Sequence, residues 1–198
     1  MMFLAGGCAT TPPSQFYVLT PMERHAAAAS TTTATSGNEI SVGVGPLQLA
    51  DYLEGPQLVT RPTPNRLLIE EFHRWGGTLQ GNLLTVLAMN LAMLLESDQV
   101  ARYPWDEPVD PDYRVRLDVL QFDGMLGRSV DLDTRWEIVG PGRSDRYGLK
   151  LLRAGRVVHT EPVAGDSYEA LVAAQSRAVA ALSRELAGQL QEAASVRK

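Results

Sequence analysis

The sequence predicts an α+β fold, in which a mostly antiparallel sheet carries two amphipathic helices on one face. Two observations predict it: several segments of the second half alternate apolar and polar residues, and two long segments repeat apolar residues at helical spacing. The chain has 198 residues, 44% hydrophobic and 21% charged, which suits one folded domain. We place that domain at residues 15–192, before a tail at 193–198.

The N-terminal part predicts a tether, a strand and a loop. Residues 9–14 are small and proline-containing, so they form a tether that reaches at most ~20 Å. Residues 15–20 are rich in aromatic and β-branched types and predict a strand, which Pro21 ends. Residues 22–38 are Ala/Thr-rich and of low complexity, and predict a mobile loop. The alternative is a domain that begins at Glu39, with only tether before it.

The middle of the chain predicts a strand, a hairpin and a helix. Residues 39–49 alternate as a half-buried strand that is interrupted at Gly45-Pro46. Residues 58–61 and 66–72 flank a proline-rich turn and form a short hairpin. Residues 79–95 carry leucines at helical spacing. The polar residues that lie largely off this apolar stripe are Gln80, Asn82, Asn90 and Glu96.

The second half predicts a strand-rich region that ends in a helix. Strands are expected at 113–119, 130–138 and 147–153, and Ala154-Gly155 is expected to form a tight turn into the next strand. Residues from 167 to about 192 have one apolar face and predict the second helix. Asp166 and Glu169 resemble a capping box at its start.

Charge and composition exclude several classes of function. The net charge is −5 and the basic residues are scattered, which argues against binding nucleic acid or gripping anionic lipid. A single cysteine permits neither an internal disulfide nor a thiolate metal site. No apolar run approaches the 18 or more residues that a membrane helix needs, so the body does not span a bilayer.

The sequence holds no recognisable catalytic motif. The histidines stand in separate segments, at His25, His73 and His159. Asp123, Asp131 and Asp133 alternate on a strand rather than in an ordered loop, so we expect solvated charges there and not a calcium site. A nucleophile elbow, a phosphate-binding loop and a dinucleotide fingerprint are all absent from the sequence. We therefore expect no enzyme activity, no metal and no cofactor.

The only cysteine ends the run Leu4-Ala5-Gly6-Gly7-Cys8. Small residues before an early cysteine are what signal peptidase II needs before a cysteine that is to be lipidated. A complete secretory segment has a basic region and roughly 7–15 apolar residues, more than precede Cys8 here. Residues 1–8 are therefore either the remnant of a lipoprotein signal peptide, or Cys8 is an incidental exposed thiol.

Residues along nearly the whole chain resemble one family, the ABC-type transport auxiliary lipoproteins that are similar to paraquat-inducible protein C. The segments that carry the resemblance are Phe16-Tyr17-Val18-Leu19 after the cysteine, Val44-Gly45-Pro46-Leu47, Pro56-Gln57-Leu58-Val59-Thr60-Arg61, Glu71-Phe72-His73-Arg74-Trp75, Tyr103-Pro104-Trp105, Arg135-Trp136 and Leu171-Val172-Ala173-Ala174-Gln175-Ser176.

The resemblance implies a non-catalytic lipoprotein that faces the periplasm and carries its lipid on Cys8. It would dock with a mammalian-cell-entry (MCE) domain protein and an ABC transporter that move lipids between membranes. The fold would be akin to the amino-terminal domain of TolB. Ala9 after the cysteine favours the outer membrane, with the inner membrane as the alternative. A homo-oligomer is compatible with the resemblance. The rival functions are a lipid-binding carrier and a TolB-like envelope scaffold.

Six aromatic and arginine residues at strand ends and loops are candidate partner contacts, because both types are enriched at interface hot spots. The alternative for the two tryptophans is that they fill the edge of the core. The candidates are Tyr52, Arg61, Arg74, Trp75, Tyr103 and Trp105.

Overall fold

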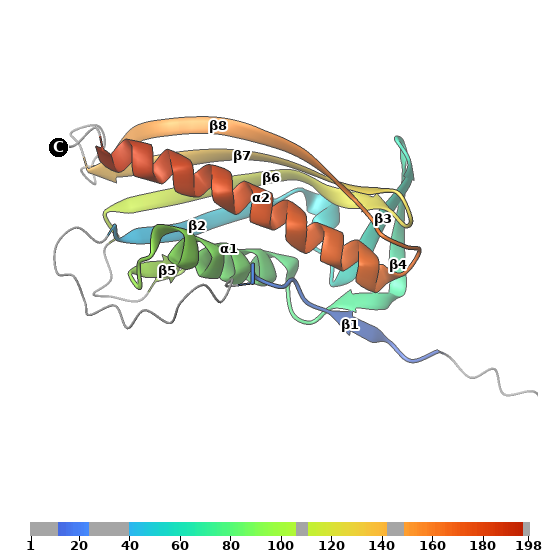
Figure 1. The fold of residues 1–198 in the computed structure, drawn as a ribbon. Coiled ribbons are helices and arrows are strands. Elements are labelled where there is room, and N and C mark those ends of the chain that lie inside the picture. The colour runs from blue at the N-terminus through green and yellow to red at the C-terminus, as the bar shows by residue number, and fades with distance from the viewer. Residues whose placement is uncertain (1–11, 24–39, 106–110, 142–148, 196–198) are drawn as a thin grey trace, which may run out of the picture.

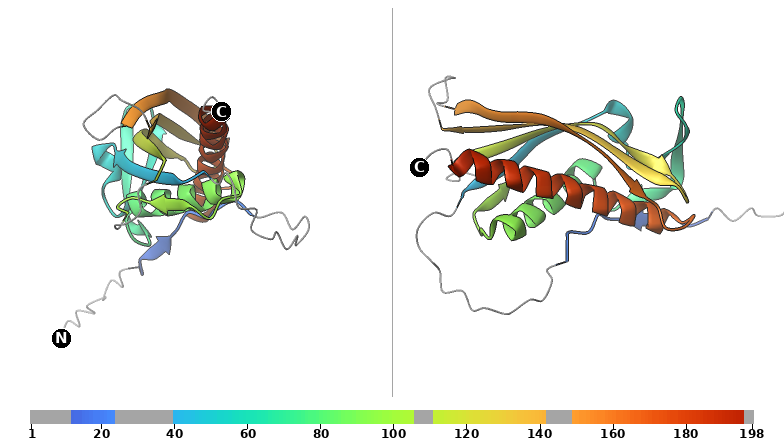
Figure 2. Two further views of the ribbon diagram at one scale, coloured as in Figure 1. Left: turned by 90° about the vertical axis from the view of Figure 1, so that its left-hand side faces the viewer. Right: turned by 45° about the horizontal axis from the view of Figure 1, so that its top comes forward.

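The computed structural model describes residues 12–23, 40–105, 111–141 and 149–195. In these ranges eight strands form one mixed sheet, and two α-helices lie against one of its faces (Figure 1 and Figure 2). The predicted α+β fold is confirmed. The elements are β1 (Gln15–Tyr17), β2 (Val42–Leu49), a 3-10 turn η1 (Asp51–Leu53), β3 (Gln57–Thr63), β4 (Arg66–Trp75), α1 (Leu79–Leu95), β5 (Val100–Arg102), β6 (Tyr113–Met125), β7 (Ser129–Pro141), β8 (Leu149–Pro162) and α2 (Tyr168–Ser195).

The sheet combines antiparallel and parallel pairs around its long strand β6. The order of hydrogen-bonded neighbours is β1-β4-β3-β6-β2-β5. In addition, β7 pairs with β6, and β8 pairs with β7. The expected antiparallel pairing holds for β3–β4 and for β6–β7–β8. β2 is parallel to both β5 and β6, and β1 is parallel to β4. Parallel neighbours need long crossovers, and the chain between β2 and β6 supplies one through the β3–β4 hairpin and α1.

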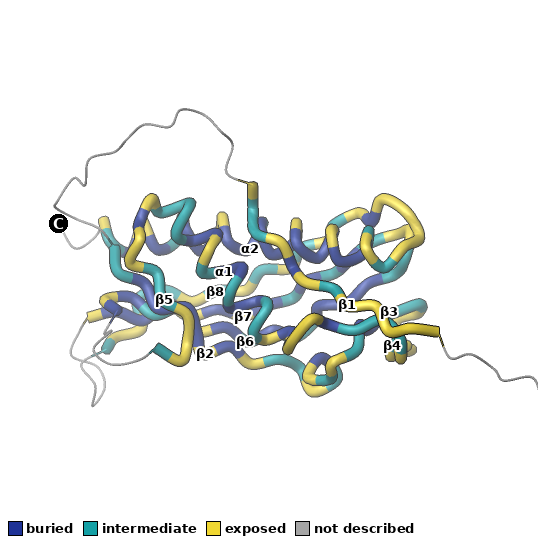
Figure 3. The backbone as a smooth tube through the Cα atoms, turned by 90° about the horizontal axis from the view of Figure 1, so that it is seen from below, coloured by how far each residue is buried: buried dark blue, intermediate teal, exposed yellow. Residues whose placement is uncertain are grey.

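The core lies between the sheet and the two helices (Figure 3). The alternation predicted for residues 113–119 of β6 and 130–138 of β7 is confirmed, because every second residue of these ranges is buried. Each fully buried large aliphatic side chain stabilises the fold by roughly 1.5–3 kcal/mol. The fully buried large side chains include Leu87 and Leu91 of α1, Phe122, Leu132 and Ile138 of the sheet, and Leu171, Leu182 and Leu186 of α2.

Helix α1 has the predicted bounds, with a cap that the spacing did not reveal. The Thr78 side chain accepts a hydrogen bond from the Gly81 amide at its start, and Glu96 adopts a left-handed conformation at its end. Asn90 was expected off the apolar stripe but is completely buried, so that expectation was wrong. Its amide group donates to the Ser183 hydroxyl of α2 at 3.0 Å, which satisfies a polar group inside the helix interface.

The segment after β1 leaves the sheet and lies along both helices. The predicted strand extends to residue 20, but β1 ends at Tyr17. Helix side chains accept hydrogen bonds from the next backbone amides: Asn82 from Leu19 at 3.3 Å, Ser176 from Thr20 at 3.1 Å, and Asn90 from Met22 at 2.8 Å. Both helices therefore hold this pinned segment, residues 18–22, in place. Apart from residues 22 and 23, the predicted 22–38 loop lies outside the described residues.

Strand β8 corrects the predicted turn at Ala154-Gly155. The strand runs without a break from Leu149 to Pro162, and Gly155 pairs with Trp136. A Cβ atom at Gly155 would lie 2.5 Å from the Trp136 ring, so glycine is needed here for a close approach and not for a turn.

Helix α2 also differs from expectation at both ends. The Ser167 hydroxyl, rather than Asp166, accepts a hydrogen bond from the Ala170 amide at its start. Asp166 instead lies against Gly127 in the β6–β7 turn. The helix continues to Ser195, into the residues expected as tail. Neither helix of the described residues is both long and apolar enough to cross a membrane.

Acid is expected to weaken the contact between β8 and α2. Burial alone would raise the pKa of Glu161, but hydrogen bonds from His159 and Arg177 outweigh it and hold the pKa below its usual 4.5. The carboxylate therefore stabilises the fold above that value, and the contribution is lost as pH falls through the lower folded-state pKa. Glu161→Gln should lose less stability than the natural chain between about pH 5 and about pH 3, as urea unfolding at each pH measures. Parallel losses in the two proteins would contradict this.

Candidate functional site

The six predicted contact residues fall into two groups at different parts of the molecule. Tyr52, Arg61, Arg74 and Trp75 belong to η1, β3 and β4, on the side of the sheet where β1 lies (Figure 1). Tyr103 and Trp105 follow β5, a short strand that Figure 1 shows below the C-terminal half of α2. Cys8 and the neighbouring residues 1–11 lie outside the described residues.

Tyr52 and Arg61 meet at a buried carboxylate, Asp123 of β6. Arg61 donates to both carboxylate oxygens, from Nε at 2.7 Å and from Nη2 at 2.8 Å. The Tyr52 hydroxyl donates to Asp123 Oδ2 at 2.5 Å, and Gln121 Nε2 donates to Oδ1 at 3.1 Å. The Asp123 side chain is fully buried, whereas that of Arg61 is 25% exposed. We call Tyr52, Arg61 and Asp123 the hairpin latch.

Electrostatics within the hairpin latch favour the charged pair. Burial, followed by the hydrogen bond and charge of Asp123, raises the pKa of Tyr52 to about 12, so its hydroxyl stays protonated as a donor. The hydrogen bond to Asp123 is also the main reason that the pKa of Arg61 is raised. A bidentate guanidinium–carboxylate pair fixes orientation as well as charge, so the latch joins β3, close to the turn of the β3–β4 hairpin, to β6.

Asp123 is the member of the latch that sequence reasoning placed wrongly, as a solvated charge of the sheet face. Two features bury it. A register shift between Val119 and Gln121 changes which residues of β6 face the core, so that Phe122 points inward. β3 then pairs with β6 at Thr60 and Gly124, which brings the Arg61 side chain, together with that of Tyr52, over the Asp123 carboxylate. The broken alternation of apolar residues, Val119 followed by Phe122, was the available signal for a bulge at this point.

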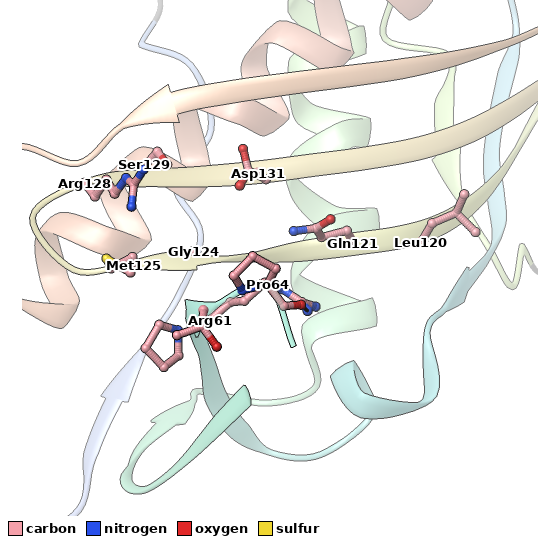
Figure 4. Close-up of a pocket in the computed structure, with 11 residues that line it drawn as sticks. Arg61, Pro64, Leu120, Gln121, Gly124, Met125, Arg128, Ser129 and Asp131 are labelled. Atoms are coloured by element: carbon pink, nitrogen blue, oxygen red, sulfur yellow. Dashed lines mark hydrogen bonds between the residues drawn. The ribbon is translucent and has the colours of Figure 1, made fainter. Parts of the chain in front are cut away.

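An open groove of about 440 Å³ lies beside the latch, between the hairpin and β6–β7 (Figure 4). Arg61 and Pro64 line one side, and Gln121, Met125 and Asp131 line the other. The Arg61 guanidinium already donates its hydrogen bonds to groups of the protein, since Nη1 also donates to the Pro64 carbonyl at 3.2 Å. The latch therefore has the features of a structural brace that shapes the hairpin. Among the described residues, no three His, Cys, Asp or Glu side chains gather so as to hold a metal ion.

Tyr103 and Trp105 form an aromatic pair after β5. Their rings meet edge to face with centroids 5.3 Å apart, and Tyr103 is 44% exposed. The Arg114 guanidinium lies 5.5 Å from the centroid of the Trp105 ring, within cation–π range. Gly43 of β2 makes room for this ring, because a Cβ atom there would lie 2.9 Å from it.

The remaining two candidates lie at the end of β4 and do not share one environment. Trp75 is only 4% exposed and packs in the hydrophobic core. Arg74 is partly buried and stands opposite Phe16 in the pairing of β1 with β4. Its Nε atom is buried without a hydrogen-bond partner among the described residues.

The chain matches the model of one protein family over residues 17–187; the family is described as ABC-type transport auxiliary lipoprotein component. No curated protein matches the sequence. A crystal structure of an uncharacterized protein is similar, with a TM-score of 0.70 and 18% identity, over 90% of this chain and 99% of that one.

Protein XCC0632 from Xanthomonas campestris, of the DUF330 family, is also similar, with a TM-score of 0.70 and 16% identity, over 93% of this chain and 98% of that one. A PelC dodecamer from Paraburkholderia phytofirmans is less similar, with a TM-score of 0.43 and 16% identity, over 79% of this chain and 95% of that one. The likeness to the first two structures shows that this chain has the same fold as they do.

Proposed function

Because the chain belongs to the family of ABC-type transport auxiliary lipoprotein components, we propose that it is a docking component of a lipid-transport system. In this proposal a lipid on Cys8 anchors the protein in a membrane and its body faces the periplasm. An MCE-domain protein and an ABC transporter are its partners. The family is an auxiliary transport family and not a known family of enzymes, so the proposed role is non-catalytic.

The pinned segment is the observation that carries the proposal. Residues 18–22 are held by side chains of both helices, so the body cannot move freely away from the chain that precedes it. Residues 9–14 reach at most ~20 Å. A body held that close to its anchor cannot cross the periplasm alone, and a partner has to supply the span. Ala9 favours the outer membrane as the place of the anchor.

The grooves on the described surface favour docking over carrying. Four of them have volumes of about 360–480 Å³, and each of these is open to solvent and lined by both polar and apolar residues. A carrier needs a site that encloses most of its lipid. Lipid that copurifies with an unanchored Cys8→Ala chain, detected by mass spectrometry, would favour the carrier instead.

The anchor is tested by Cys8→Ala, exported behind a substitute signal peptide that carries no lipidation site. We expect the variant to leave the membrane fraction and lipid transport to fail, because stable anchoring takes acyl chains on the protein. The natural chain, exported behind its lipidation signal, is the control. Membrane association and transport that survive Cys8→Ala would refute the anchor.

Partner contact is tested by comparing Tyr103→Ala with Trp75→Ala. Tyr103 is exposed, so its substitution should leave the melting temperature within about 2 °C while capture of the MCE-domain protein is lost. Trp75 is a core residue, so its substitution should lower the melting temperature. Pull-down from detergent-solubilised membranes and thermal unfolding measure the two effects. Undiminished capture by Tyr103→Ala would exclude this surface, and capture of Tol-Pal components in place of the MCE protein would favour the scaffold.

A further inference from the structure

Two large apolar side chains, one in strand β1 and one just after it, face the outside of the molecule. Phe16 is 66% exposed and Val18 is 55% exposed. Both side chains line the same groove, so they lie on the same side of the chain. Figure 3 shows this strand as a largely exposed edge of the molecule. Single exposed apolar residues are ordinary, but here two adjoin one groove.

That groove has a volume of about 410 Å³ and separates β1 from the first turns of α2. Its other lining residues include Tyr17 of β1 and Val172 and Ala173 of α2. Phe16 and Val18 line this groove, and contacts of the neighbouring backbone keep them from moving further into it. Phe16 is fixed in the pairing of β1 with β4, and Val18 directly precedes Leu19, whose amide donates to Asn82 of α1.

We propose that Phe16 and Val18 insert into the boundary between headgroups and acyl chains of the membrane that holds Cys8. This inference rests on the proposed anchor and adds a second membrane contact, made by the folded body itself. A body with both contacts is fixed in orientation on the membrane, whereas a lipid tether alone would leave it free to turn.

The length of chain before β1 identifies the membrane as the occupant of this surface. Phe16 is the eighth residue after Cys8, so at full extension it lies at most about 29 Å from the cysteine. The nearest large apolar phase to these two side chains is then the bilayer itself. Apolar side chains of interfacial segments enter such a boundary by about 5–10 Å.

Charge and strand length argue against other occupants. Glu169 of α2 lines the groove, so attraction to anionic headgroups does not drive the contact, and zwitterionic lipid should serve as well as anionic lipid. β1 has only three residues, which offers few backbone hydrogen bonds to an added strand of a partner protein.

The test uses the single cysteine to attach the full, unlipidated chain to phosphatidylcholine vesicles that carry a maleimide headgroup. Phe16→Trp places an indole at the proposed contact, and Val158→Trp is the matched control, since Val158 is 68% exposed on β8. Lipids brominated on their acyl chains quench indoles that enter the bilayer. The unsubstituted chain gives the background of Trp75, Trp105 and Trp136.

We expect bromolipid quenching of the indole at position 16 to exceed that at position 158 by about threefold, and Val18→Trp to behave like Phe16→Trp. Equal quenching at positions 16 and 158, or quenching at 16 that appears only with anionic lipid, would overturn the inference. Protection of position 16 by an added MCE-domain protein, with no quenching by bromolipid, would assign the surface to that protein and also overturn it. Because the attachment is chemical, either failure is distinct from a finding that Cys8 carries no lipid in the cell.

Discussion

Asp123→Ala is expected to lower the free energy of unfolding by about 3–5 kcal/mol, because it leaves the Arg61 guanidinium in a partly buried site without its counter-charge. The Tyr52 hydroxyl and the Gln121 amide lose their acceptor in the same step. For a chain of this size the loss corresponds to a fall in melting temperature of roughly 6–20 °C. Urea unfolding at neutral pH measures the change.

Two further variants separate the latch from a general effect of removing a carboxylate. Asp133→Ala removes an aspartate that also accepts two hydrogen bonds from an arginine, Arg156, but at the exposed sheet face. It should cost only a small fraction of the loss at Asp123, since exposed pairs contribute little. Arg61→Leu with Asp123→Ala should be more stable than the sum of the single changes implies. Equal losses at Asp123 and Asp133, or strict additivity with Arg61, would contradict the latch.

Gly124→Ala is expected to destabilise the protein by about 3 kcal/mol or more, although the change adds only one methyl group. A Cβ atom at Gly124 would collide with the Ser129 carbonyl oxygen and lie 2.8 Å from Val130 Cα. Both are backbone atoms of the paired strand β7, so no side chain can turn away to make room. β3 also meets β6 at this residue, so that three strands converge on one glycine.

The matched control is the same substitution at Gly188, in the interior of α2. A Cβ atom there meets nothing within 4 Å. Alanine has a higher helix propensity than glycine, so Gly188→Ala should stabilise the protein by about 0.5–1 kcal/mol. Thermal and urea unfolding should therefore give changes of opposite sign at the two positions. A Gly124→Ala chain as stable as the natural one would contradict the close approach of the strands.

Local periodicity predicted most of the secondary structure. The leucine spacing gave α1 its observed bounds, alternation located β6 and β7, and the proline-rich turn located the β3–β4 hairpin. The short strand β5 and the turn η1 were not predicted, since three residues are too few to show a period. The break expected at Ala154-Gly155 was wrong because a glycine read in isolation suggests a turn, whereas here it accommodates the Trp136 ring from the neighbouring strand.

The site was predictable only in part, because its key residues depend on contacts between distant segments. Tyr52 and Arg61 were chosen for their residue type, and the structure brings these two together at Asp123. Nothing local distinguishes the fully buried Asp123 from the partly exposed Asp131 and Asp133, since all three belong to alternating strands. Asn90 was misplaced for the same reason. Its partners, Met22 and Ser183, come from opposite ends of the chain.

The contacts of the pinned segment also determine how late in folding it can be held in place. A ribosome delivers residues 18–22 near the start of the chain, yet the Ser176 hydroxyl that holds the Thr20 amide belongs to the last element to be made. Contacts between such distant residues carry the largest loop-closure entropy and form late. The Leu19 and Met22 amides can therefore meet their partners once α1 has formed, whereas the Thr20 amide finds its partner only when α2 arrives.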